Sequence, residues 1–142
     1  MKKLFPNEEI IDTKFFNAHQ DWETPISGFF IIASKRNIRS VCEFSEEELK
    51  EFIELVYRIR VGMKELLGIK RIFLFQNEDS KHYFHFWLFP QYSWMKKFGE
   101  GSRSIIPIKK YAEKHLATEK NMLKIKTLVQ EMKKYLEENY AL

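Results

Sequence analysis

Three apolar runs along the chain have the composition of β-strands. Gly28 to Ser34 contains a continuous apolar run, as expected of a strand that is buried on both faces. Ile69 to Phe75 and His82 to Phe89 are rich in aromatic and β-branched residues, and a short polar stretch separates them. Two strands joined in this way predict an antiparallel hairpin. Pro90 cannot donate to a ladder, so it should end the second strand.

A helical period replaces the strand pattern between the first and second of these runs. Apolar residues recur at helical spacing from Leu49 to Leu67. Ser45 and Glu48 have the spacing of a capping box, and Gly68 suits the left-handed residue that follows a last turn. The pattern predicts one long amphipathic helix of about six turns.

Two shorter regions, near the start and the end of the chain, complete the predicted secondary structure. Near the start, apolar residues that include Ile10 and Phe16 predict a short strand, or a helix and a strand. Near the end, Ser104 is a possible cap of a short helix, and Thr118 is a possible cap of a final amphipathic helix. The chain of 142 residues is long enough to bury one core. We predict an α+β domain over residues 1–100 and a C-terminal helical extension over residues 101–142, packed on the same domain.

Charge and cysteine content narrow the classes of partner. The net charge is +4, but the Lys residues of the basic second half alternate with Glu along the predicted helices. This distribution argues against nucleic-acid binding, whereas mild basicity suits phosphate-bearing ligands.

The single cysteine, Cys42, excludes an internal disulfide and fits a cytoplasmic location. No apolar run approaches the ~20 residues that span a bilayer, so we expect no membrane association.

The main candidate for a catalytic residue lies in the predicted strand that ends at Pro90. Side chains alternate along a strand, so Tyr83, His85 and Trp87 should share one face. A histidine inside an apolar strand costs free energy unless it is hydrogen-bonded. Its ordinary pKa, about 6.5, suits proton transfer or nucleophilic catalysis. A satisfied core histidine is the alternative that the residues leave open.

The remaining histidines predict no metal site. His82 is three residues from His85, which on a flat strand places the two rings on opposite faces. No cluster of carboxylates or cysteines accompanies them. We expect His19 and His115 on the surface.

The segment from Tyr83 to Pro90 resembles the signature of the histidine triad (HIT) family. In that signature, His-φ-His-φ-His-φ-φ with φ apolar, a Pro often follows the last apolar residue. Counting back from Pro90, the three triad positions are Tyr83, His85 and Trp87, so this chain has only the middle histidine. The resemblance covers roughly residues 9–95. It implies a HIT-like α+β fold, in which an antiparallel sheet carries a long helix on one face and a nucleotide site on the other.

The resemblance also implies a role for each residue of the site. His85 would be the nucleophile, with one ring nitrogen held by a backbone carbonyl of the motif. Asp21, seven residues before Gly28, would bind the ribose hydroxyls, although an Asp in this loop could equally form a turn. The other nucleotide-binding residues would surround the phosphate (Gln76, Asn77, Ser80, Tyr83 and Trp87) or sandwich the base (Ile10 and Phe16).

The function implied is hydrolysis or nucleotidyl transfer at the α-phosphate of a purine nucleotide or dinucleoside polyphosphate, through a nucleotidyl-histidine and without a cofactor. Trp87 can donate through its indole N–H but cannot protonate a leaving group. A nucleotide-binding protein without turnover is therefore an alternative, and a structural domain with a core histidine is a third. HIT proteins commonly form homodimers through the long helix, where Leu55 and Tyr57 lie beside the main apolar face.

Overall fold

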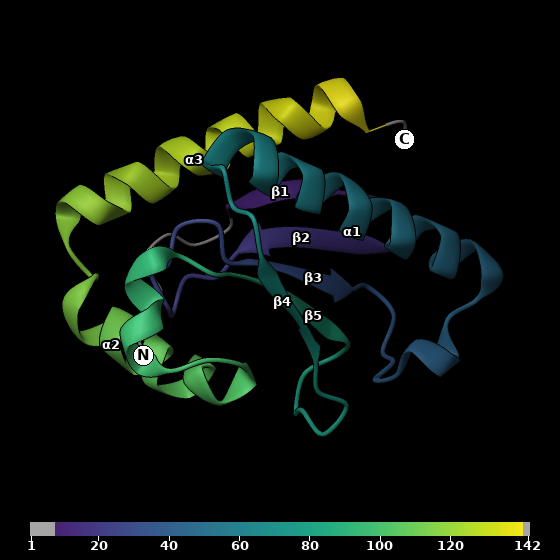
Figure 1. Ribbon diagram of the computed structural model, residues 1–142. Coiled ribbons are helices and arrows are strands. Elements are labelled where there is room, and N and C mark those ends of the chain that lie inside the picture. Colours follow the sequence, from purple (N-terminus) through teal and green to yellow (C-terminus); the bar gives the residue numbers. More distant parts are fainter. Residues whose placement is uncertain (1–7, 141–142) are drawn as a thin grey trace.

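The computed structural model describes residues 8–140 and contains one five-stranded antiparallel sheet with the strand order β1-β2-β3-β5-β4 (Figure 1). The strands are β1 Glu9–Asp12, β2 Phe16–Gln20, β3 Phe30–Ser34, β4 Ile72–Gln76 and β5 His85–Pro90. The helices are α1 Glu46–Leu67, α2 Ile105–His115 and α3 Glu119–Asn139, with 3-10 turns η1 Val41–Glu43, η2 Ser93–Phe98 and η3 Ser102–Ser104. The α+β class is confirmed, and the early apolar residues form two strands. Residues 1–7 of the predicted domain and residues 141–142 of the predicted C-terminal extension lie outside the described residues.

The predicted helix ends are present in the structure. The Ser45 hydroxyl accepts from the Glu48 backbone N–H at 3.1 Å, and the Glu48 carboxylate accepts from the Ser45 N–H at 2.8 Å. Gly68 follows α1 in the left-handed region, with φ of 65°. The Thr118 hydroxyl accepts from the Asn121 N–H at 3.2 Å and caps α3. Local sequence therefore determines where these two helices begin.

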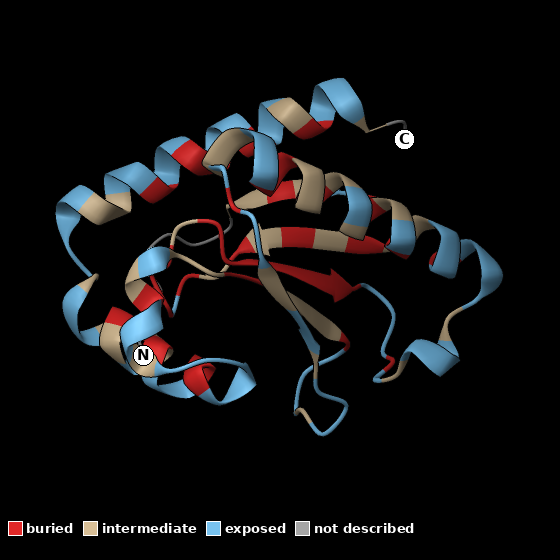
Figure 2. Cartoon of the chain, in the orientation of Figure 1, coloured by how far each residue is buried: buried red, intermediate tan, exposed pale blue. Residues whose placement is uncertain are grey.

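Helices α1 and α3 lie together on one face of the sheet (Figure 1). Their buried stripes (red in Figure 2) meet β1, β2 and β3 in one apolar core that contains Phe16, Leu55 and Met132. At Gly62 of α1, a Cβ atom would lie only 2.8 Å from the Met132 sulfur, so glycine permits the close approach of α3. The C-terminal helix thus belongs to the main core, whereas a domain division at residue 100 stays a prediction.

The opposite face of the sheet is covered at one end by α2 and η2. Phe29, Phe89 and Met95 form a second apolar cluster there with Ile108 of α2. This cluster fixes α2 against the ends of β3 and β5, beside the part of the face that forms a pocket. None of the helices between residues 8 and 140 has the length and apolar character needed to cross a membrane.

The strand that carries His85 begins three residues later than the sequence indicates. We predicted a strand from His82, but β5 begins at His85, and residues 81–83 form a bend. The physical reason is a competing set of hydrogen bonds. The Arg39 guanidinium donates to the backbone carbonyls of Ser80 and His82, and the Ser80 hydroxyl accepts from the His82 N–H at 3.1 Å. The segment before Phe84 therefore leaves the ladder.

Candidate functional site

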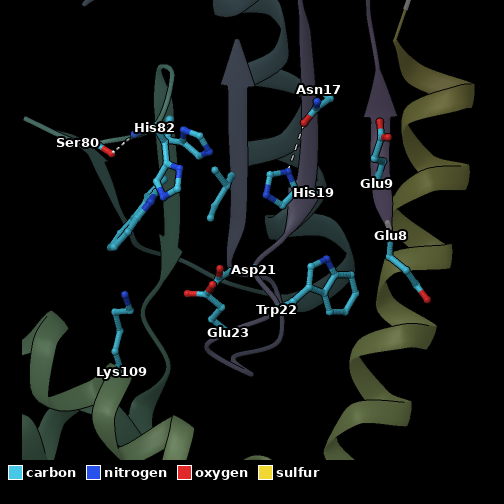
Figure 3. A pocket seen from close by; sticks show the side chains of 13 residues that line it. Glu8, Glu9, Asn17, His19, Asp21, Trp22, Glu23, Ser80, His82 and Lys109 are labelled. Carbon is cyan, nitrogen blue, oxygen red and sulfur yellow. Dashed lines mark hydrogen bonds between the residues drawn. The ribbon is translucent and has the colours of Figure 1, made fainter. Parts of the chain in front are cut away.

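A cavity of about 450 Å³ lies on the sheet face that carries α2 (Figure 3). Its lining comes from β1, β2, β3, β5, the loop after β2, the turn before β5 and α2. Thirteen residues line it: Glu8, Glu9, Asn17, His19, Asp21, Trp22, Glu23, Ile31, Ser80, His82, His85, Trp87 and Lys109. Of the residues predicted for the site, the cavity brings together His85, Asp21, Ser80 and Trp87.

His85 is half-buried and held in one orientation. Its Nδ1 atom lies 2.5 Å from the carbonyl oxygen of Tyr83, which can only accept, so Nδ1 carries the proton. The backbone carbonyl expected from the resemblance is therefore present. Burial lowers the pKa of His85, and the nearby His82 lowers it further, while the Tyr83 carbonyl acts in the opposite direction. At neutral pH, the imidazole is a neutral base with its lone pair on Nε2.

His82 shares the cavity with His85. The two ring centroids are 5.3 Å apart, and both rings line the cavity. The prediction that they lie on opposite faces is wrong, because the bend at residues 81–83 breaks the strand alternation on which it was based. Ser80, which holds the His82 N–H, also lines the cavity.

Asp21 begins the loop that follows β2. Its carboxylate accepts from the Thr24 N–H at 3.0 Å and also lines the cavity, so it forms a turn and still borders the ligand space. Burial raises the pKa of Asp21 to about 6, while the Thr24 hydrogen bond and the Lys109 charge limit the rise. Gln20, buried on the other side, holds the loop through the Gly28 N–H at 3.1 Å and the Ile26 carbonyl at 2.8 Å.

Trp87 forms the boundary between β5 and α2. Its ring packs edge-on against Phe29, with centroids 5.1 Å apart, and tilted against Phe75 at 5.5 Å. The ammonium group of Lys109 lies 4.6 Å from the centroid of the same ring, a cation–π contact. No pattern in the sequence pointed to Lys109, because α2 lies outside the region of HIT resemblance.

Gln76, Asn77 and the Tyr83 side chain are not part of the cavity lining. The Gln76 amide donates to the Arg39 carbonyl at 2.9 Å, and the Asn77 side chain accepts from the Asp79 N–H at 3.0 Å. Gln76 therefore stabilises the backbone at Arg39, and the guanidinium of Arg39 positions the turn before β5. Tyr83 contributes its carbonyl oxygen, and its side chain is exposed.

Ile10 and Phe16 cannot sandwich a base, contrary to the prediction. Both are fully buried in the core beneath α1 and α3, where Phe16 packs against Phe52. Because side chains alternate along β2, the neighbours Asn17 and His19 face the cavity instead. His19 is half-buried, so its predicted surface position is wrong, and the alternation along this strand could have located it. His115 is exposed, as predicted.

The described side chains form no obvious metal centre. Within residues 8–140, no group of three His, Cys, Asp or Glu side chains is arranged to hold a metal ion. The cavity instead contains the neutral imidazole of His85, two further imidazoles, several carboxylates and one ammonium group.

No protein-family model matches the sequence, and no curated protein matches it in sequence. Solved structures match it in fold. A hypothetical histidine triad nucleotide-binding protein from Sulfolobus tokodaii is 16% identical, with a TM-score of 0.64, over 95% of this chain and 91% of that chain. A Plasmodium falciparum diadenosine triphosphate hydrolase, solved with cyclomarin A, is 13% identical, with a TM-score of 0.59, over 99% of this chain and 84% of that chain.

A Hit-like protein from Bartonella henselae, described as involved in cell-cycle regulation, is 19% identical. Its TM-score is 0.55, over 87% of this chain and 88% of that chain. At these identities the agreement concerns the fold. The chain therefore has the HIT-like fold that the segment around His85 predicted.

Proposed function

We propose that this protein is a HIT-like nucleotide hydrolase or nucleotidyl transferase with His85 as its nucleophile. The observation that carries the proposal is the 2.5 Å contact between His85 Nδ1 and the Tyr83 carbonyl at the edge of the cavity. It leaves Nε2 as an unprotonated nitrogen, which is the state that attacks phosphorus. Half-burial and the lowered pKa of His85 favour the same state.

The strand register supports a nucleotide that lies across the sheet. Trp87 pairs with Ile31, Ile31 with His19, and His19 with Glu9, so these four residues form a row from β5 to β1. Three strand spacings amount to about 14 Å, comparable with an extended nucleoside monophosphate. We place the α-phosphate at His85 and the base near His19, with the ribose hydroxyls at the Asp21 carboxylate.

The reaction follows from this arrangement. Nε2 of His85 attacks the α-phosphorus in line, and the bond from phosphorus to the leaving oxygen breaks with its electron pair on that oxygen. Water, or another acceptor hydroxyl, then attacks the phosphorus and releases its proton to the solvent. The nitrogen–phosphorus bond breaks, and His85 returns to its neutral form as the nucleoside monophosphate or its ester is released.

The second candidate is a protein that binds the nucleotide without turning it over. The observation that favours it is the indole ring at position 87, which offers no proton to a leaving group. Both candidates share the ligand, a purine nucleotide or dinucleoside polyphosphate.

A single-turnover experiment separates the two candidates. The protein is mixed with the nitrophenyl ester of AMP, and the intact mass is recorded at successive times. Wild type should gain the mass of one adenylyl group and then lose it, and His85→Ala should gain none. His115→Ala, which removes the exposed histidine of α2, is the control and should behave as wild type. A wild type that binds AMP but never gains the adenylyl mass would establish the second candidate.

We also propose a two-fold homodimer in the cytoplasm. Leu49, Ile53 and Tyr57 follow one another at four-residue spacing on α1 and expose 48%, 59% and 56% of their surface. Exposed apolar stripes of this kind mark interaction surfaces. Leu55, which we had grouped with Tyr57, is fully buried and is not available for such a contact.

A further inference from the structure

Lys109 supplies a positive charge to a cavity whose lining also contains four carboxylates. The carboxylates are Glu8, Glu9, Asp21 and Glu23, and among the described lining residues Lys109 is the sole Lys or Arg. A ligand with several phosphates is repelled by carboxylates and attracted by an ammonium group. Its phosphates should therefore extend toward α2, away from the β1 end, where Glu8 and Glu9 lie (Figure 3).

The position of Lys109 is fixed by its neighbours. It projects from α2, which the second apolar cluster holds against the sheet through Ile108, the preceding residue. Its ammonium group lies 4.6 Å from the Trp87 ring centroid, and that ring is itself packed between Phe29 and Phe75. Trp87 lies two residues after His85 on the same face of β5, so the ring holds the charge in the cavity that the nucleophile also lines.

We propose that Lys109 binds the departing oxyanion and thereby matches the site to leaving groups that carry phosphate. The inference rests on the proposed function. As the bond between the α-phosphorus and the leaving oxygen breaks, its electron pair becomes negative charge on that oxygen, and the ammonium group stabilises this charge. A nucleoside diphosphate can depart as an anion without gaining a proton. Stabilisation of this anion by Lys109 therefore replaces the proton that an indole at position 87 cannot supply. Trp87 then acts as the platform that positions Lys109.

Lys109 also acts on Asp21, a second partner besides Trp87. Its charge limits the rise in the pKa of Asp21, so a role confined to keeping the ribose-binding carboxylate ionised is the competing explanation. The two roles differ in what they affect. A leaving-group role depends on the phosphates beyond the α-phosphorus, whereas an Asp21 role depends on the ribose hydroxyls.

The test compares two substrates that share adenylate and differ in their leaving group. Diadenosine triphosphate releases ADP, and the nitrophenyl ester of AMP releases a phenolate without further phosphates. In Lys109→Ala, the single-turnover rate should fall about 100-fold or more for diadenosine triphosphate and about fivefold or less for the ester. Lys109→Arg should recover most of the loss. Lys110→Ala, which removes the exposed neighbouring cation of α2, should leave both rates unchanged.

Two additional measurements separate the possible outcomes. The preference for ribose over 2′-deoxyribose substrates should persist in Lys109→Ala and be lost in Asp21→Ala. If Lys109→Ala slows both substrates equally, or removes the ribose preference, the leaving-group role is wrong.

If wild type turns over neither substrate, calorimetry replaces the rates. Lys109→Ala should then weaken binding of diadenosine triphosphate but not of AMP, and equal effects on both would overturn the inference. Turnover that survives in His85→Ala contradicts the proposed function instead, whatever Lys109 does.

Discussion

The Nδ1 atom of His85 lies 2.5 Å from the carbonyl oxygen of Tyr83, while the Tyr83 side chain is exposed and outside the cavity lining. The orientation of the imidazole is thus set by the backbone of the residue that occupies the first triad position. The side chain at that position is dispensable for holding the nucleophile.

Replacing the Tyr83 side chain should therefore have little effect on catalysis. Tyr83→Ala keeps the carbonyl that accepts from Nδ1, so the rate of adenylyl transfer to His85 should remain within about twofold of wild type. The measurement is the single-turnover mass assay with the nitrophenyl ester of AMP. A large loss, with the fold intact by circular dichroism, would mean that the Tyr83 hydroxyl contacts the ligand.

His82 should contribute to the lowered pKa of His85. Burial lowers the pKa of His85 below its ordinary 6.5, and the charge of His82 lowers it further. His82→Ala removes the second effect, so the pKa should rise toward 6.5. Since only the neutral imidazole attacks, the rate should decline with falling pH from a higher pH in the variant than in wild type. Titration of labelled imidazoles by NMR measures the shift directly, and His115→Ala should leave it unchanged.

Asp21 should make ribose recognition dependent on pH. Burial raises its pKa to about 6, so the carboxylate is mainly ionised above that value and protonated below it. An ionised carboxylate accepts two hydrogen bonds from vicinal hydroxyls better than a neutral acid does. The preference for AMP over 2′-deoxy-AMP should therefore decrease as the pH falls through about 6. Asp21→Asn should show a small preference that does not change with pH, and calorimetry at several pH values tests both.

The exposed stripe on α1 should control assembly. Ile53→Glu places a charge at the centre of Leu49, Ile53 and Tyr57, which should prevent burial of the stripe in a dimer. Sedimentation at tens of micromolar should give a dimer for wild type and a 17.2 kDa species for the variant. Ile106→Glu is the matched control, because Ile106 of α2 is 58% exposed but lies on another helix. A monomeric wild type would contradict the proposed homodimer.

Glu48 should stabilise the fold in its ionised form. It is 2% exposed, and the Arg36 guanidinium donates to its two carboxylate oxygens at 2.8 and 3.2 Å. These hydrogen bonds lower the pKa of Glu48 from 4.5 to about 2. A lowered pKa means that the stabilisation is complete above pH 4.5 and is lost as the pH falls toward 2.

We expect Glu48→Gln to reduce the free energy of unfolding by about 1–2 kcal/mol at pH 7, since the partner guanidinium is partly exposed to solvent. Urea denaturation measures this change. The difference between wild type and variant should become small as the pH is lowered below 4.5. Glu47→Gln, in the same helical turn but exposed, should change the stability by less than about 0.5 kcal/mol. Equal effects of the two substitutions would argue against a special role of the Arg36 contact.

Local sequence determined the ends of several elements and the position of the nucleophile. The capping box at Ser45, the glycine at 68 and the proline at 90 each act within a few residues, so their effects could be predicted without knowing the fold. Alternation along β5 correctly placed His85 and Trp87 on one face. The carbonyl that holds His85 is two residues away in the chain, which is also a local relationship.

Tertiary structure decided which other residues reach His85. His82 lines the cavity because Arg39, more than forty residues earlier, donates a hydrogen bond to the His82 carbonyl, which would otherwise pair in the strand. Ile10 and Phe16 face the core because α1 and α3 cover that side of the sheet, and no local pattern shows which face the helices cover. Lys109 reaches Trp87 because apolar packing of Ile108 holds α2 at the end of β5. Long-range contacts bring together residues whose spacing in the sequence carries no periodic signal, so only the folded chain could reveal this part of the site.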